Sequence, residues 1–121
     1  MLLAHLVGDY VLQSHWMATE KTKKIWPAVA HGVVYTLPFL FLTQSWVALL
    51  VICGTHIVID RYRLAKHVVW AKNMFAPKPF RAPHTDTGYP LATPAWLSVW
   101  LLIIVDNTMH LAINAFAILY L

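Results

Sequence analysis

The feature that most constrains this chain is a set of four apolar segments, residues 1–17, 26–43, 45–65 and 95–121, that also carry ionisable side chains. A helix that spans a membrane needs about 20 mostly apolar residues, with a range of about 17–25. The last three segments meet this length, and the first is marginal. Only 12% of the residues are charged, whereas soluble domains are about a quarter charged. The pattern predicts a single all-α domain, a polytopic four-helix transmembrane bundle with a short first helix.

The basic side chains predict the orientation of this bundle. All nine Lys and Arg residues lie in or beside two connections, residues 18–25 and 64–94. Cytoplasmic connections carry an excess of Lys and Arg, so we expect both connections in the cytoplasm and both termini outside. This places the chain in the inner (cytoplasmic) membrane as a multi-pass protein. Attraction to anionic lipid explains the pI of about 9.4 without a nucleic-acid partner. The expected partners are membrane lipids and a second copy of the chain.

The connection between the last two segments contains most of the prolines. Residues 73–94 hold five of the seven prolines and are predicted to form a cytoplasmic loop. Loops of this length are often functional, although a solvated turn is the simpler interpretation. The single Cys53 lies in an apolar stretch, and we interpret it as a packing residue.

Polar residues recur within the apolar segments at helical spacing. Three of the five acidic residues and four of the seven His residues lie there. Each ionisable group costs about 2.5–3.5 kcal/mol even on membrane-insertion scales, so these groups need partners, protons or a metal. Residues four apart lie on one face of a helix. The expected stripes are His5–Asp9–Gln13, His31–Tyr35, His56–Asp60 and Asp106–His110–Asn114.

The depth of these residues in the membrane indicates a shared site. Counted from the cytoplasmic ends of the segments at 1.5 Å per residue, Asp9, His31, His56 and Asp106 fall within about one and a half turns of the same level. Asp60 is shallower, beside Arg61, and His110 is deeper. We expect Asp9, His31 and His56 to converge with His5, with Asp60 nearby. Mixed imidazole and carboxylate ligands suit zinc, manganese or iron.

Three stretches carry a resemblance to a known family. The sequences LLAHLVGDYVLQSHWMATEKTKK, AVAHGVVYT and THIVIDRYR resemble the small bacterial and phage membrane proteins catalogued as domain of unknown function 3307. The resemblance covers about residues 1–66 and brings no established activity. A looser similarity to membrane-bound, metal-dependent hydrolases implies a metal site, and Asp106 and His110 match neither pattern. The family pattern falls on His5, Asp9, Gln13, Lys21, His31, His56, Asp60 and Arg61.

The functional hypothesis is a metal-dependent hydrolase that acts on an amphipathic substrate at the inner leaflet. No Gly-x-Ser-x-Gly nucleophile motif is present, which favours a metal-activated water. Zinc is the first choice of metal, with manganese and iron as alternatives. Asp60 would act as general base and Arg61 would hold an anionic head group. The expected ligands are His5, Asp9, His31 and His56, supported by Gln13, Tyr35, Asp106 and His110, which would orient the ligands or contact the substrate.

Two alternatives belong to other functional classes. The polar stripes could join helices or protomers in a non-enzymatic membrane module, although interhelical hydrogen bonds average only about 0.6 kcal/mol. Intramembrane His and Asp residues can also relay protons or ions. The metal content of the purified protein separates the first hypothesis from both alternatives.

Overall fold

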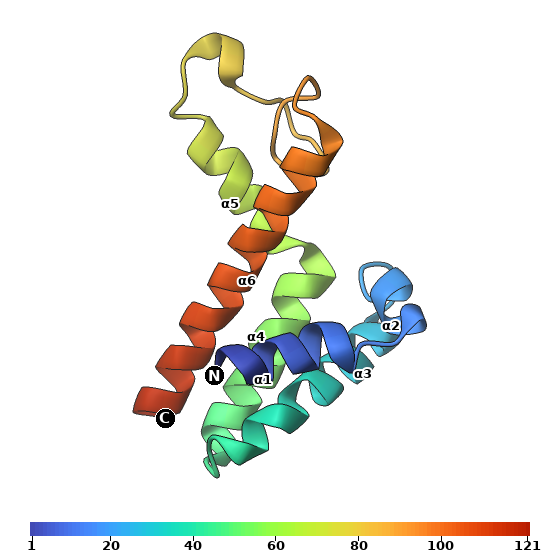
Figure 1. The fold of residues 1–121 in the computed structure, drawn as a ribbon, viewed down its shortest axis with the longest axis vertical. Coiled ribbons are helices and arrows are strands. Elements are labelled where there is room, and N and C mark those ends of the chain that lie inside the picture. The colour runs from blue at the N-terminus through green and yellow to red at the C-terminus, as the bar shows by residue number, and fades with distance from the viewer. The chain divides into compact units, whose positions relative to one another are not determined.

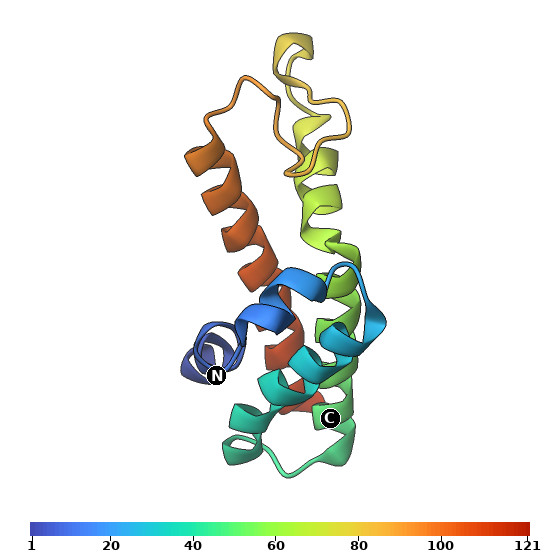
Figure 2. The same ribbon diagram turned by 90° about the vertical axis from the view of Figure 1, so that its right-hand side faces the viewer.

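All 121 residues are described by a computed structural model, in which six α-helices and three shorter helical turns form the chain without any β-strand (Figures 1 and 2). The all-α prediction is therefore confirmed. The elements are α1 (Leu2–Leu6), the π-helical turn η1 (Val7–Val11), α2 (His15–Glu20), α3 (Ile25–Thr36), the 3-10 turn η2 (Leu37–Phe41), α4 (Trp46–Tyr62), α5 (Leu64–Asn73), the 3-10 turn η3 (Lys78–Phe80) and α6 (Ala95–Tyr120).

The chain forms two compact units. The first unit contains residues 1–62 together with the end of α6, residues 110–121. The second unit contains residues 63–109. Arg63 lies at the boundary, where its left-handed backbone, with φ of 51° and ψ of 48°, ends α4 and allows α5 to start. A left-handed conformation is uncommon for a residue other than glycine, so this junction is a defined break in the helical path.

The first apolar segment is divided rather than forming one helix. α1 continues into η1, whose wider turn is closed by a hydrogen bond from the Leu12 amide to the Val7 carbonyl at 2.9 Å. The helical path then stops, and α2 starts after Ser14, whose Oγ accepts a hydrogen bond from the Met17 amide at 3.3 Å. Serine is a preferred residue at this capping position because its side chain satisfies an otherwise unpaired amide. The apolar part of the segment is thus shortened to Leu2–Val11.

A helical hairpin formed by α3 and α4 is the centre of the first unit, and both views show the two helices side by side (Figures 1 and 2). The α-helical ladder of α3 gives way to η2 at Pro38, which has no amide hydrogen to continue it. Ser45 then caps α4 by accepting a hydrogen bond from the Ala48 amide at 3.3 Å. Where the two helices meet, a Cβ atom at Gly32 would collide with the side chain of Ile57. The glycine therefore permits the close approach of the two helices.

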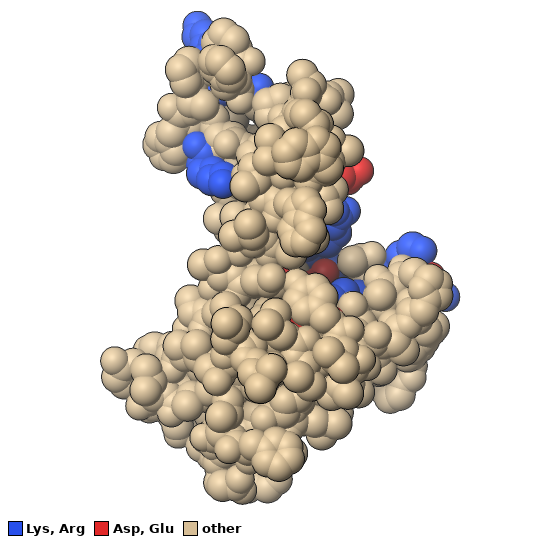
Figure 3. Space-filling model, viewed as in Figure 1, with Lys and Arg blue, Asp and Glu red and all other residues tan.

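The first unit has a partly polar interior and an apolar exterior. Its apolar core contains Tyr35, Phe39, Ala48, Leu49, Ile52 and Ala117. Beside this core lie seven buried polar residues: His5, Asp9, His31, His56, Asp60, His110 and Asn114. Large apolar side chains are instead exposed, and Phe41 reaches 92% exposure. Most of the surface drawn in Figure 3 is likewise uncharged, with Lys and Arg gathered in a few places. Buried carboxylates combined with so many exposed large apolar side chains are uncommon in soluble proteins.

The second unit contains a helix and a folded loop where the sequence indicated only a connection. All but the first two residues of α5 lie outside the four predicted segments, because the helix includes Lys66, His67 and Lys72. The proline-rich chain after η3 folds back onto α5, and the Asn73 side-chain amide donates to the Gly88 carbonyl at 2.9 Å. Gly88 has a φ of 78° and packs against α5 so closely that a Cβ would lie 2.6 Å from the Lys66 carbonyl oxygen. Only glycine satisfies both requirements.

One helix, α6, is long and apolar enough to cross a membrane. The helical stretches Leu2–Val11 and Ile25–Phe41 are apolar but shorter. The structure thus supports one of the four predicted spans by length and composition.

Candidate metal centre

Four buried side chains from three elements converge in the first unit. Asp9 comes from η1, His31 from α3, and His56 and Asp60 from successive turns of α4. Each residue is at most 6% exposed. One nitrogen or oxygen atom from each lies within 4.8 Å of the others, so the group could hold a metal ion.

The separations between these four atoms are close to those of a tetrahedral site. His31 Nε2 lies 3.1 Å from Asp9 Oδ1, 3.3 Å from Asp60 Oδ2 and 2.9 Å from His56 Nε2. His56 Nε2 lies 3.4 Å from Asp60 Oδ2 and 3.8 Å from Asp9 Oδ1. Ligands bound to zinc at about 2.0–2.1 Å in a tetrahedron are about 3.3 Å apart. The donor set and its spacing therefore fit a divalent ion of zinc size.

Lys21 brings a positive charge to the edge of the cluster. Its Nζ lies 2.5 Å from Asp60 Oδ2, 3.2 Å from His31 Nε2 and 3.9 Å from Asp9 Oδ1. The sequence placed Lys21 only in a basic connection and in the family pattern, with no role assigned. Its position could have identified it. Lys21 lies in the short connection between α2 and α3, from which a long side chain can reach back toward His31.

The connection that carries Lys21 is fixed by charged neighbours. The Arg61 guanidinium donates hydrogen bonds to the carbonyl oxygens of Thr22 and, at 3.1 Å, of Lys23. Glu20 forms ion pairs of 3.1 Å with both Lys23 and Lys24. Hydrogen bonds first from Lys24 and then from Lys23 hold the pKa of Glu20 below its usual value. The neighbouring lysines are thereby held at the exposed side, while Lys21 turns toward the cluster.

His110 links two members of the cluster from α6. Its Nε2 lies 3.1 Å from Asp60 Oδ1, and its Nδ1 lies 3.2 Å from His56 Nδ1. If Asp60 is ionised it can only accept, so His110 Nε2 carries hydrogen and His110 Nδ1 is an acceptor. His56 Nδ1 then donates, which leaves a lone pair on His56 Nε2. This chain of hydrogen bonds directs a ligand atom into the cluster.

His5 lies outside the four-residue group, although the sequence placed it among the ligands. Its Nδ1 is 2.8 Å from the Tyr35 hydroxyl oxygen, which also accepts a hydrogen bond from the Asn114 amide at 2.6 Å. The Tyr35 ring stacks on His56 at 3.6 Å with an angle of 10°. The pair formed by His5 and Tyr35 therefore lies beside His56, with the Tyr35 ring packed against the His56 ring.

The remaining predicted residues have different positions. Gln13 lies beyond the end of η1 and is half-buried, and its Oε1 is a buried acceptor without a hydrogen-bond partner. His31 Nδ1 is likewise buried without a partner, since the ring turns Nε2 into the cluster. Asp106 is half-buried on α6 in the second unit, one turn before His110. The catalytic role of Asp60 and the head-group role of Arg61 stay predictions.

Comparison with known proteins identifies one family. The family described as a protein of unknown function, DUF3307, matches residues 1–82. This range includes all four residues of the cluster together with Lys21 and Arg61. No curated protein and no solved structure matches the chain. The looser similarity to hydrolases is therefore not supported by any of these comparisons.

Proposed function

This chain belongs to the DUF3307 family, and we propose that it is an inner-membrane protein with a divalent metal centre, zinc foremost, that hydrolyses an amphipathic substrate. Asp9, His31 and His56 would be the ligands, and Asp60 would be the general base. The observation that carries this proposal is the convergence of four buried donor atoms with five separations between 2.9 and 3.8 Å. Burying these ionisable side chains together costs free energy, because they lose their hydration. A bound cation or shared protons would offset this cost.

A membrane location is supported by the inverted distribution of polarity in the first unit. Asp9 and Asp60 are buried, whereas Leu3, Phe41 and Leu50 are 73%, 92% and 71% exposed. Lipid tails would cover such side chains without the cost of contact with water. The proposed topology has four membrane passes with both termini outside. α6 alone has the length of a complete span, so the shorter helices would require tilt or local thinning of the bilayer.

A hydrolytic role is supported because the four donor residues are not equivalent. Asp60 already interacts with His110 through Oδ1 and with Lys21 through Oδ2. A catalytic zinc site has three protein ligands and keeps one position for water. A divalent ion there would lower the pKa of a bound water and would itself act as a Lewis acid. Asp60 would not be a ligand in this arrangement: its carboxylate would accept the proton of that water, and Lys21 would bind an anionic oxygen of the substrate.

The charges of the cluster favour an anionic substrate. Two carboxylates and one ammonium, with neutral imidazoles, leave one negative charge. A divalent ion would change this to one positive charge, and a phosphate or carboxylate group of the substrate would neutralise it. A partly buried site favours such neutral combinations. We therefore propose lipid-linked phosphate esters of the inner leaflet, or acyl esters of lipids that also carry a phosphate or carboxylate group, as the substrate class.

A second candidate function is a non-enzymatic membrane module, and the position of Lys21 favours it. The Lys21 ammonium is already within 4.0 Å of both carboxylates. A proton on His31 would make the cluster neutral without a metal. The polar residues would then hold α3, α4 and the end of α6 together.

Elemental analysis of the detergent-purified protein separates the two functions. We expect about one equivalent of zinc in the wild type, and less than about a tenth in His31→Ala and His56→Ala. His15→Ala is the matched control, because His15 is an exposed histidine outside the cluster. A wild-type protein that carries under about a tenth of an equivalent, and gains none on titration, would leave the non-enzymatic module as the function.

Hydrolysis itself is tested with Asp60→Asn. This variant should keep zinc but lose turnover of phosphate or acyl esters that carry a lipid chain, because general bases contribute about 10²–10⁴-fold. Zinc retained by a wild-type protein that turns over neither ester class would show that the metal is structural.

A further inference from the structure

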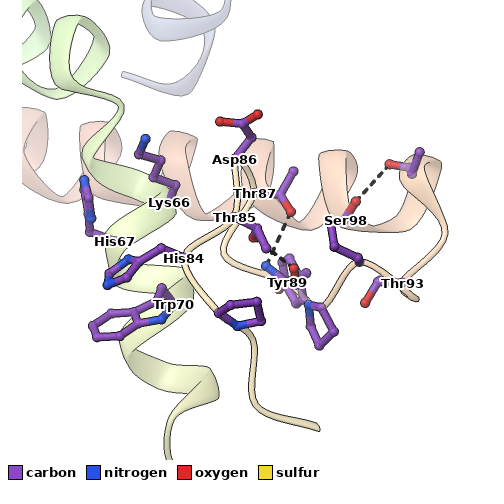
Figure 4. Close-up of a pocket in the computed structure, with 14 residues that line it drawn as sticks. Lys66, His67, Trp70, His84, Thr85, Asp86, Thr87, Tyr89, Thr93 and Ser98 are labelled. Carbon is purple, nitrogen blue, oxygen red and sulfur yellow. Dashed lines mark hydrogen bonds between the residues drawn. The ribbon is translucent and has the colours of Figure 1, made fainter.

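A groove in the second unit has the chemistry of an anion site and is independent of the metal centre. It has a volume of about 580 Å³ and lies between α5, the proline-rich loop and the start of α6. This volume is within the range of about 300–1,000 Å³ that is common for ligand sites. Figure 4 shows side chains from all three segments around it.

The loop that forms one wall of the groove is attached to α5 and is also braced by hydrogen bonds within itself. His84 stacks on the Trp70 indole, with ring centroids 4.2 Å apart and an angle of 19° (Figure 4). Thr85 Oγ1 accepts a hydrogen bond from the Gly88 amide and donates to the Tyr89 carbonyl, both at 2.9 Å. The Asn73–Gly88 hydrogen bond described above adds a further attachment. The groove is therefore formed before any ligand arrives, which lowers the entropic cost of binding.

The charges around the groove leave one cation without a partner. Asp86 is the one acidic residue of the lining, and its carbonyl and carboxylate are contacted by Arg63 at 3.0 Å and 3.8 Å. Lys66, on the same helix as Trp70, makes no side-chain hydrogen bond or ion pair. His67 and His84 add two exposed imidazoles whose nitrogens make no hydrogen bond. An ammonium and imidazole N–H groups are donors that suit phosphate oxygens.

We propose that this groove binds a phosphate-bearing anion, and that Lys66, His67 and His84 contact the phosphate. Two sources supply this chemistry, the head group of an anionic phospholipid and a free phosphate ester. Leu91 lines the groove and is 88% exposed, and Phe75 and Phe80 of the same unit are 92% and 67% exposed. Aromatic and apolar side chains beside a basic site are typical of a membrane surface. The family match ends at residue 82, so the loop wall lies outside it.

Native mass spectrometry of the full chain in detergent tests this proposal. The protein is offered equal concentrations of phosphatidylglycerol and phosphatidylcholine, and glycerol 3-phosphate is then added as a competitor. We expect retention of one phosphatidylglycerol per chain in preference to phosphatidylcholine. Lys66→Gln should weaken this binding about tenfold, since a charge-assisted hydrogen bond is lost, and His84→Ala should weaken it as well. Lys78→Gln is the matched control, with the same change of charge outside the groove lining.

Each result of the lipid-binding experiment leads to a different conclusion about the groove. Displacement of the lipid by an equal concentration of glycerol 3-phosphate would support the phosphate site and identify a free ester as its ligand. Equal retention of the two lipids, or equal effects of Lys66→Gln and Lys78→Gln, would overturn the proposal. Zinc content measured on the same samples keeps this result separate from the metal centre.

Discussion

Lys21 is the residue at which the two proposed functions differ most. Its ammonium lies 3.9 Å from Asp9 Oδ1 and 2.5 Å from Asp60 Oδ2, and no other Lys or Arg forms an ion pair with either carboxylate. A bound divalent ion would take over this role, because it would lie among the same oxygens. The energetic importance of Lys21 should therefore depend on whether a metal is bound.

Lys21→Met should be tolerated when zinc is present and should be harmful when it is removed. Loss of one partner from a buried ion pair costs about 3–5 kcal/mol, and we expect this loss only with chelator. The measurement is the midpoint of thermal unfolding of wild type and variant, each with zinc and with chelator. Equal destabilisation in both conditions would identify Lys21 as the permanent cation of a metal-free cluster.

His110 and His5 are both buried histidines with different hydrogen-bond partners. His110 hydrogen-bonds to His56 and Asp60, whereas His5 hydrogen-bonds to Tyr35. His110→Phe should weaken zinc binding by about 10–100-fold, as is typical when a group that orients a metal ligand is lost. His5→Phe should change the unfolding temperature without this effect on affinity. Competition titration against a chelator measures both, and an equal loss of affinity would contradict the assigned roles.

The site could be predicted from the sequence in part. Asp9, His31 and His56 were placed together by their common depth, and the structure brings their side chains together. Asp60 was expected nearby at a shallower depth, and it is part of the cluster because it lies one turn after His56 on the same helix. His5 was expected beside Asp9 through α-helical spacing. In the structure His5 hydrogen-bonds to Tyr35, while Asp9 lies in the π-helical turn η1 and contacts His31.

At the scale of elements, the closeness of α3 and α4 determines whether His31 and His56 can meet. Gly32 lies one residue after His31, and a Cβ there would collide with Ile57 of α4. Gly54 lies two residues before His56, and a Cβ there would have no neighbour within 4 Å. Gly32 is packed against the neighbouring helix and Gly54 is not, so the two helical glycines form a matched pair for substitution by alanine.

Gly32→Ala should lower stability by about 1–3 kcal/mol, the usual cost of extra volume at a packed contact, and should weaken zinc binding. Gly54→Ala should raise stability by about 0.5–1 kcal/mol, because alanine favours the helix more than glycine does. Thermal unfolding followed by circular dichroism compares the two. A destabilised Gly54→Ala variant together with a neutral Gly32→Ala variant would contradict the described helix contact.

The elements of the second unit were the hardest to predict. Hydropathy identifies long apolar helices, whereas α5 is short and contains Lys66, His67 and Lys72. The folded loop depends on contacts between distant residues, such as Trp70 with His84 and Asn73 with Gly88. Such contacts leave no periodic pattern in the sequence. The prolines correctly indicated the absence of a continuous helix, but they gave no information about the groove.

At the scale of the whole molecule, the proposed topology can be tested separately from any metal. All Lys and Arg residues lie in or beside the two connections that we expect in the cytoplasm. On a Cys53→Ala background, Lys23→Cys and Lys78→Cys should react with a membrane-impermeant thiol reagent only from the cytoplasmic side. Labelling of either position only from the periplasmic side would invert the topology and would move the proposed substrate to the other leaflet.

The central claim is that Asp9, His31 and His56 hold a divalent ion, and X-ray absorption at the zinc edge of the purified full chain tests it most directly. The proposed centre predicts nitrogen and oxygen neighbours at about 2.0–2.1 Å, with the outer-shell scattering of imidazole and no sulfur. His31→Ala should lose this spectrum, and His15→Ala should keep it. A sulfur neighbour at about 2.3 Å would place the zinc on Cys53 instead, and the absence of bound zinc would leave the buried residues as a metal-free polar cluster. Either result would rule out a zinc centre held by Asp9, His31 and His56.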